Sequence, residues 1–295
     1  MDNRLTCTPV TGVKGGESFL ITSKESAVLA ETGFGCSADK TVSNLKRELD
    51  GRKLDYILLT HSHYDHAGGT PAIKAAFPEA TIVASETCAY VFTRPGALAT
   101  IRKMDLSAAE MAGLKDPGPD LTPELSVDLI RNVGDEIKTQ DLTIKVISGL
   151  GHTRCCQSYF FEEDSLLVAT ESSGCQVATS FQAAFLVSYK EALQTIEMIR
   201  QLAPRYILSP HYRVLTESES AEYPNKAKKE ATETADFILS RHKAGASFDE
   251  IYSDFVEKYY NQTIRSSGYQ PRFAFEVNAK ALIPRLIEEM AGDYS

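Results

Sequence analysis

The stretch that decides the fold is residues 56–66, which read Tyr-Ile-Leu-Leu-Thr-His-Ser-His-Tyr-Asp-His. It opens with an apolar run whose length favours a buried strand over a helix. The rest has the form HxHxDH and holds three of the six histidines of the chain. Alternate side chains at the end of a strand project to the same side, so we expect His61 and His63 to point together. Asp65 and His66 lie in the turn that follows, which can aim them at a neighbouring point.

The HxHxDH loop predicts a site for two metal ions. Histidine and carboxylate side chains suit zinc, manganese and iron, and zinc is the usual choice for hydrolysis. Two pairs of such ligands on one loop favour two ions a few ångströms apart over a single ion. Because two ions need about six ligands or more, further donors are expected downstream.

Three later residues are candidates for those donors, and each stands where a predicted strand passes into a loop: His152, Glu171 and His211. Rigid elements at such junctions can hold a site. A single histidine of this kind is more often structural, and a single glutamate is more often an exposed charge. The HxHxDH loop changes that interpretation in favour of metal ligands. The sixth histidine, His242, lies in a helical segment and is expected at the surface.

The pattern up to residue 208 alternates short strands with helices, which is typical of an α/β fold. Residues 18–22 and 27–30 indicate a hairpin, because two apolar runs flank a polar turn. Residues 85–123 are less regular, contain helix-like pieces, and end in the breaker cluster Asp-Pro-Gly-Pro-Asp. We interpret them as an excursion from the fold rather than a domain boundary.

Only helices are predicted after His211, over residues 217–242, 248–260 and 272–290. We therefore predict an α/β domain over residues 1–215 and a C-terminal helical extension over residues 216–295. The extension is expected to pack on the domain, either capping the site or providing the surface of a homodimer.

Composition and charge narrow the class of protein. The 295 residues are 43% hydrophobic, enough for a sizeable core, and the net charge is −9 with a pI of about 5.3. This acidic balance argues against a nucleic-acid partner and against docking on an anionic membrane. No apolar run approaches the roughly 20 residues of a membrane span, and no signal-peptide pattern follows residues 1–4. We expect a cytoplasmic protein with a small-molecule substrate and six free cysteines.

The HxHxDH loop, the Gly-His turn, the acidic residue after a hairpin and the final histidine resemble the metallo-β-lactamase superfamily, in order and spacing over residues 5–215. The resemblance implies an αββα sandwich, with two sheets packed together and helices outside. It implies that one metal is held by His61, His63 and His152. It implies that the other metal is held by Asp65, His66 and His211.

Two glutamates stand where this superfamily usually has aspartate. Glu171 falls at the place of the aspartate that bridges both ions. Glutamate is one methylene longer, so the sequence leaves open whether Glu171 bridges both ions, binds one of them or weakens a site. Glu31, in Ala30-Glu31-Thr32-Gly33, takes the place of an aspartate whose role would be to support the metal loop.

The helical tail resembles the thioesterase-type members of the superfamily, such as the quinolone-signal-response thioesterase and the hydroxyacylglutathione hydrolases. That resemblance implies a metal-dependent hydrolase that uses a hydroxide activated by a dinuclear metal centre, on an acyl thioester or ester. Asp65 is the expected catalytic residue, because it would bind its ion and orient the nucleophile. Tyr212 and Arg213, beside His211, are candidate substrate-binding residues, with packing at the surface as the alternative.

Two other functional classes remain open from the sequence. One is an oxidoreductase of the persulfide dioxygenase type with non-haem iron, and the other is a regulatory protein with a vestigial metal site, suggested by Glu171. Metal content and oxygen consumption with glutathione persulfide distinguish the first alternative. Alanine substitution of His63 and Asp65 distinguishes the second, because a regulatory role would survive it.

Overall fold

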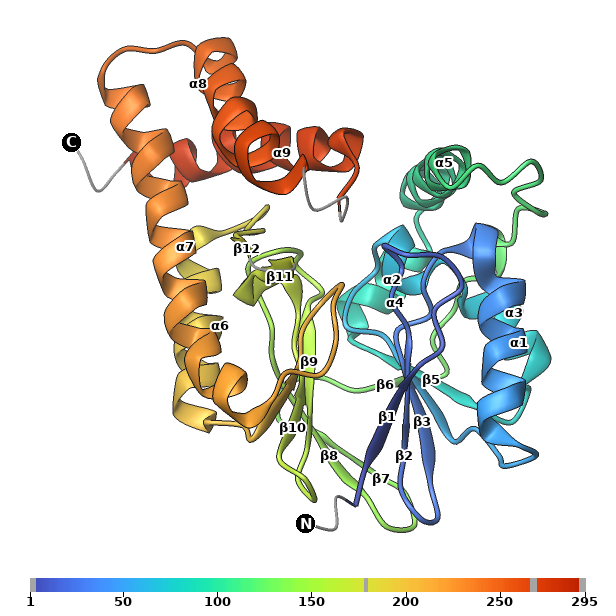
Figure 1. Cartoon of the computed structure of the whole chain (residues 1–295). Helices are drawn as coiled ribbons and strands as arrows, with labels where there is room; N and C mark the ends of the chain where they lie inside the picture. The colour runs from blue at the N-terminus through green and yellow to red at the C-terminus, as the bar shows by residue number, and fades with distance from the viewer. Residues whose placement is uncertain (1–3, 178–179, 266–269, 292–295) are drawn as a thin grey trace. The chain divides into compact units, whose positions relative to one another are not determined.

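The computed structural model describes residues 4–177, 180–265 and 270–291 (Figure 1). The chain forms two compact units. The first unit contains Met1–Ile147 and Cys155–Val168, and the second contains Ser148–Arg154 and Ala169–Ser295. The sequence predicts a boundary after residue 215, between the α/β domain and the helical extension. That boundary differs from the division into these two units, and it stays a prediction.

The first unit is built around a six-stranded sheet. Its strands follow in spatial order: β1 (Thr6–Pro9), β2 (Phe19–Thr22), β3 (Ala27–Ala30), β4 (Tyr56–Leu58), β5 (Thr81–Ala84) and β6 (Leu129–Ile130). The predicted hairpin is confirmed, because β2 pairs antiparallel with β3. From β3 to β6 the neighbours are parallel. The carboxyl ends of β3, β4 and β5 therefore meet at one edge, where the HxHxDH loop begins.

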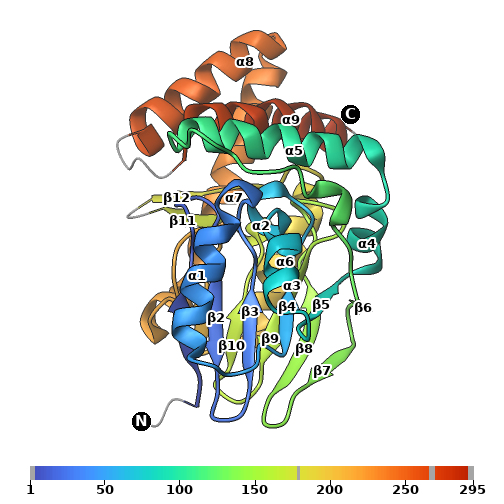
Figure 2. The same ribbon diagram turned by 90° about the vertical axis from the view of Figure 1, so that its right-hand side faces the viewer.

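Helices of the first unit cover this sheet, and the chain enters them after it leaves the carboxyl ends of the strands. They are α1 (Ala38–Leu49), α2 (Tyr64–Ala67), α3 (Thr70–Ala76), α4 (Glu86–Phe92) and α5 (Pro95–Met111). Helix α1 packs beside α3 (Figure 1) and buries Leu45 and Leu49, which are four residues apart on one face. Burial of each leucine is worth roughly 1.5–3 kcal/mol. The excursion predicted over residues 85–123 forms α4 and α5, and α5 packs on α2 (Figure 2).

A second sheet in the first unit packs on the first one. Its strands in this unit lie in the order β10 (Leu166–Val168), β9 (Gln157–Phe161), β8 (Thr143–Ser148) and β7 (Glu136–Lys138). The Ser26 hydroxyl lies 2.7 Å from the Thr139 hydroxyl, and the Tyr56 hydroxyl donates to the Lys138 carbonyl at 3.3 Å, so side chains of the first sheet bond to the second. The two sheets share their buried faces, which is the arrangement expected of a β-sandwich.

The second unit is mostly helical. Its elements are β11 (Cys175–Val177), β12 (Ser180–Gln182), α6 (Tyr189–Leu202), β13 (Tyr206–Leu208), α7 (Glu217–Lys243), α8 (Phe248–Phe255) and α9 (Arg272–Met290). Capping boxes at Thr216 and Ser247 begin α7 and α8. Helices α6 and α7 pack against each other (Figure 1), and the small side chains of Ala192, Ala227 and Ala231 in their core allow a close approach.

The α/β class and the C-terminal helices are confirmed, but one predicted helix is partly wrong. The helix expected over residues 248–260 is α-helical only to Phe255 and continues as a π-helix over Val256–Ile264. There the Thr263 hydroxyl donates to the Lys258 carbonyl, five residues earlier, at 3.2 Å. Hydrophobic spacing does not distinguish the two helix types, because an amphipathic face persists through the wider turns.

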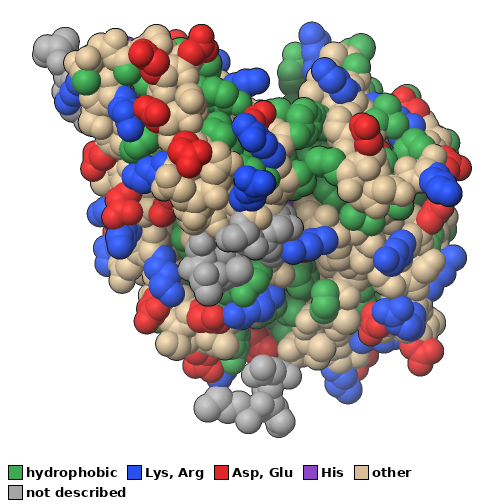
Figure 3. All heavy atoms as spheres, turned by 45° about the horizontal axis from the view of Figure 1, so that its top comes forward, with side chains coloured by type: hydrophobic (Ala, Val, Ile, Leu, Met, Phe, Trp, Pro, Cys, Tyr) green, Lys and Arg blue, Asp and Glu red, His purple; other side chains and the backbone are tan. Residues whose placement is uncertain are grey.

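Two surface observations accompany the fold. Among the described residues, no helix combines the length and the apolar character needed to cross a membrane. Acidic and basic side chains are interspersed on the face that Figure 3 shows.

The six cysteines are free thiols, as predicted, and Cys88, Cys155, Cys156 and Cys175 are buried.

Candidate metal centre

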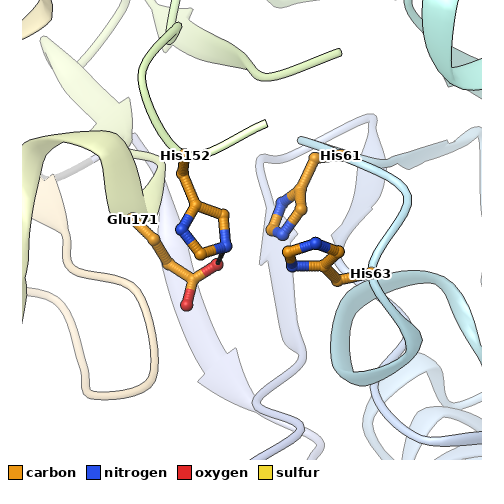
Figure 4. A group of neighbouring side chains, drawn as sticks. All are labelled: His61, His63, His152 and Glu171. Atoms are coloured by element: carbon orange, nitrogen blue, oxygen red, sulfur yellow. Dashed lines mark ion pairs between the residues drawn. The ribbon is translucent and has the colours of Figure 1, made fainter. Parts of the chain in front are cut away.

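The HxHxDH loop brings its four candidate ligands together within the first unit. His61 follows β4, and His63 is the N-cap of α2, whose first turn carries Asp65 and His66. The ring centroid of His61 lies 4.7 Å from that of His63 and 4.2 Å from that of His66. His61 and His63 offer donor atoms within 4.8 Å of each other, and so do Asp65 and His66. His61 and His63 lie close together, as strand alternation predicts (Figure 4), and the first turn of α2 carries Asp65 and His66.

Glu31 supports this loop, as the resemblance implies. It lies at the end of β3 with a φ of +62°, a left-handed conformation that a residue other than glycine adopts only under constraint. Its carboxylate accepts the Thr60 N–H at 3.1 Å and lies 3.7 Å from Nδ1 of His66. The Thr60 hydroxyl in turn lies 3.0 Å from Nδ1 of His61. Contacts of this kind orient an imidazole before it binds a metal.

In the second unit, His152 is fixed by two other segments. Its side chain is buried, its N–H donates to the Ser172 hydroxyl at 2.8 Å, and its Nδ1 lies 2.6 Å from the Ala184 carbonyl. A carbonyl only accepts, so Nδ1 donates a proton to it, and Nε2 is the ring nitrogen on the other side. A hydrogen bond of this kind at Nδ1 orients the ring so that Nε2 is the nitrogen that would bind a metal.

Glu171 lies between the two histidines of the second unit. One carboxylate oxygen, Oε2, is 2.8 Å from Nε2 of His152 (Figure 4), and the other, Oε1, is 2.9 Å from Nε2 of His211. Burial raises the pKa of Glu171, but the two imidazoles outweigh it and hold the pKa well below its usual range. The longer side chain of glutamate thus reaches both histidines at once.

His211 and its neighbours form a tight turn in the second unit. A β-bridge pairs Leu208 with Val214, and His211 has a φ of +55° at the tip of the turn. Strained backbone of this kind occurs often at functional sites. Arg213 donates to both carboxylate oxygens of Glu219, at 2.7 and 3.0 Å, and lies over the Tyr212 ring. The Glu219 hydrogen bonds raise the pKa of Arg213, and the role of Tyr212 and Arg213 in substrate binding stays a prediction.

The supporting residues Ser172, Ala184 and Glu289 were not foreseen from the sequence. Glu289 of α9 accepts hydrogen bonds from Ser188 and from the Tyr189 N–H, at the start of α6. The N–H groups of residues 187 and 188 donate to the Gly151 carbonyl, directly before His152. No local sequence pattern could have indicated these contacts, because neither a backbone carbonyl nor an isolated glutamate forms part of a recognisable motif. His242 is exposed, as predicted.

A two-sheet α/β fold with clustered histidine and carboxylate donors defines a class of metal-binding proteins. Within that class, a family model described as "Metallo-beta-lactamase superfamily" matches residues 11–211. The chain therefore belongs to the metallo-β-lactamase superfamily, and the αββα class that the resemblance implies is confirmed.

Similar proteins agree with this assignment. A "Beta-lactamase-like protein 2 homolog" from Drosophila melanogaster is 23% identical over 283 residues, which cover 93% of this chain and 84% of that protein. A hydroxyacylglutathione hydrolase from Stenotrophomonas maltophilia (strain R551-3) is 53% identical over 34 residues, 12% of this chain and 13% of that protein. A metallo-beta-lactamase family protein from Thermus thermophilus has a similar fold, with a TM-score of 0.65, 16% identity, and 98% and 94% of the two chains covered.

Proposed function

We propose that this protein is a hydrolase of acyl thioesters or esters that depends on two divalent metal ions, most suitably zinc. The observation that carries the proposal is the HxHxDH loop, which gathers three imidazoles and a carboxylate within one short segment of the first unit. Such a set of nitrogen and oxygen donors is suited to zinc, with manganese and iron as the other metals that fit.

The proposed ligand sets are those that the resemblance to the superfamily implies. One ion would be held by His61, His63 and His152, and the other by Asp65, His66 and His211. Glu171 would serve both, because each of its oxygens faces one histidine of a different set, at 2.8 and 2.9 Å. When bound, the two ions would supply Lewis acidity and a hydroxide nucleophile near neutral pH.

The protein's own groups have distinct roles in this proposal. Asp65 stands in the first turn of α2, and its carboxylate would orient the attacking nucleophile. The Ala184 carbonyl holds Nδ1 of His152, so Nε2 is the ring nitrogen that would bind the ion. Glu31 holds the Thr60 N–H, and through it the start of the metal loop.

The thioester or ester class rests on likeness rather than on a contact in the structure. The superfamily consists largely of hydrolytic metalloenzymes, and one relative over a short stretch is named for the hydrolysis of hydroxyacylglutathione. An acyl carbonyl is also the group that a pair of metal ions activates well, since one ion can stabilise the developing oxyanion.

A hydrolysis screen with metal analysis of the same sample tests the proposal. Purified protein is assayed on acyl-CoA, glutathione thioesters, lactones and phosphodiesters, and its metal content is measured by mass spectrometry. The expected result is about two metal ions per chain and turnover of a thioester or ester. Turnover of phosphodiesters alone contradicts the substrate class. Oxygen uptake with glutathione persulfide that is faster than any hydrolysis contradicts hydrolysis as the main activity.

A further inference from the structure

The two residues that precede His61, Leu59 and Thr60, make a hydrogen bond with each of their backbone N–H and carbonyl groups. Leu59 donates its N–H to the Val83 carbonyl of β5 at 3.0 Å, which extends the sheet one residue beyond β4. Thr60 donates its N–H to the Glu31 carboxylate at 3.1 Å. Both donors are thus fixed from within the first sheet.

The two acceptors of the same residues are fixed from the second sheet. The Gln157 N–H donates to the Thr60 carbonyl at 3.0 Å. The Tyr159 hydroxyl donates to the Leu59 carbonyl at 2.9 Å and lies 3.3 Å from the Val83 carbonyl. Strand β9 therefore holds the chain at the point where it leaves β4 and enters the metal loop.

Tyr159 contributes to this arrangement through its side-chain hydroxyl. Its side chain is fully buried, at 0% exposure, and burial raises the pKa of the phenol well above its ordinary value, so it stays a neutral donor. The Gln157 side-chain amide donates to the same hydroxyl at 2.8 Å, which fixes the direction of its proton. A phenylalanine would fill the same space, so the hydroxyl is distinguished by its hydrogen bonds rather than by packing.

We propose that the Tyr159 hydroxyl is a positioning group for the metal loop. By holding the Leu59 carbonyl, it sets the direction in which the chain leaves β4, and it keeps His61 and His63 in place before a metal binds. The inference rests on the proposed function in one respect, namely that the HxHxDH loop binds metal. Groups that support metal ligands from outside commonly change affinity by about 10- to 100-fold, and a group acting through the backbone is expected near about tenfold.

Tyr159→Phe tests the inference against a matched control, Tyr56→Phe. The Tyr56 hydroxyl also joins the two sheets, through the Lys138 carbonyl, but it is at the opposite end of β4 from the loop. Metal-free protein is titrated with Zn²⁺ in competition with a chromogenic chelator, and the absorption spectrum of the Co²⁺ form is recorded. We expect about tenfold weaker Zn²⁺ binding and an altered Co²⁺ spectrum for Tyr159→Phe, and neither change for Tyr56→Phe.

A second measurement separates positioning from general stability. Amide hydrogen exchange of the metal-free proteins is expected to be faster in residues 59–64 for Tyr159→Phe, with unchanged exchange in α1. If Tyr159→Phe does not fold, Gln157→Leu replaces it, because that change removes the bond to the Tyr159 hydroxyl and keeps the backbone bond to Thr60. Affinity, spectrum and exchange equal to those of the unaltered protein overturn the inference.

The outcomes for the unaltered protein are distinct from these. Unaltered protein that binds Zn²⁺ but hydrolyses no substrate contradicts the proposed function and leaves the positioning role intact. Equal Zn²⁺ affinity in Tyr159→Phe and the unaltered protein overturns the positioning role and leaves the proposed function intact. Unaltered protein that binds no metal contradicts both.

Discussion

The two parts of the candidate ligand set are built in opposite ways. In the first unit, all four candidate ligands lie within residues 61–66, and the chain before them is held by backbone hydrogen bonds to two sheets. In the second unit, His152, Glu171 and His211 come from separate turns, and side chains hold one another in place. The first arrangement is visible as a motif, whereas the second exists only after folding.

This difference has an energetic side. Strand-end hydrogen bonds in the first unit belong to a sheet that forms for other reasons, so they orient the ligands at little extra cost. In the second unit, a buried carboxylate lies between two imidazoles, and such a group is costly to bury without partners. Removal of a ligand should therefore affect metal binding in both units, but it should affect stability mainly in the second.

The largest effect is expected from substitution of a candidate ligand in the first unit. His63→Ala removes one imidazole from the HxHxDH loop and should lower metal binding and hydrolysis by more than about 100-fold, beyond the usual effect of losing a supporting group. His242→Ala, at an exposed histidine of α7, is the matched control and should change neither. Metal content and kcat/KM on the best substrate of the screen measure both. Full activity in His63→Ala would rule out the loop as the site.

The corresponding substitution in the second unit is Glu171→Gln. The amide keeps the length of the side chain but cannot supply a negative charge to two ions, so we expect about 10- to 100-fold weaker binding of at least one ion. Titration with Zn²⁺ of this variant and of the unaltered protein measures the difference. Glu197→Gln, an exposed carboxylate of α6, serves as the control. Unchanged stoichiometry and affinity would show that Glu171 does not contribute to either site.

Metal removal probes both units together. Ions that bind only the folded protein stabilise it by about 2.7 kcal/mol at a free concentration of about 100 times Kd. Dialysis against a chelator should therefore lower the Tm and abolish hydrolysis, and added Zn²⁺ should restore both. Differential scanning calorimetry with an activity assay on the same samples measures this. An unchanged Tm after verified metal loss would contradict binding by the folded state.

The smallest effect is expected from a remote support of the second unit. Glu289→Ala removes the carboxylate that accepts hydrogen bonds from Ser188 and the Tyr189 N–H, at the start of α6. Loss of such a cap costs about 1 kcal/mol in the free energy of unfolding. Glu288→Ala removes an exposed neighbour that pairs with Arg285 and should cost less than about 0.5 kcal/mol. Urea unfolding measures the free energy of unfolding of the two variants. Equal urea midpoints for Glu289→Ala and Glu288→Ala would exclude a capping role for Glu289.

The residues that could be predicted are those whose role depends on nearby sequence. The spacing of His61, His63, Asp65 and His66 indicated a metal loop, because a strand end and one helical turn are enough to bring them together. The C-terminal helices could be predicted from their hydrophobic faces. The π-helix after Phe255 could not be predicted, because it changes the hydrogen-bond spacing without changing the apolar face.

The residues that support the ligands escaped prediction for a physical reason. The contact of Nδ1 of His152 is a backbone carbonyl, that of Ala184, and carbonyls look alike in any sequence. Tyr159 is 100 residues from the carbonyl that it holds, and an apolar strand gives no sign that one tyrosine turns its hydroxyl toward another sheet. Candidate ligands can be identified by residue type, but their supports are identified by position in space.

By itself, the sequence determined the candidate ligands, the HxHxDH loop and the α/β order of the elements, because these follow from side-chain chemistry and from periods of about two to four residues. Only the tertiary structure decided that Glu171 reaches two histidines and that Tyr159 holds the start of the loop. Such contacts join segments that are far apart in the chain, and their geometry exists only once the strands and turns have packed.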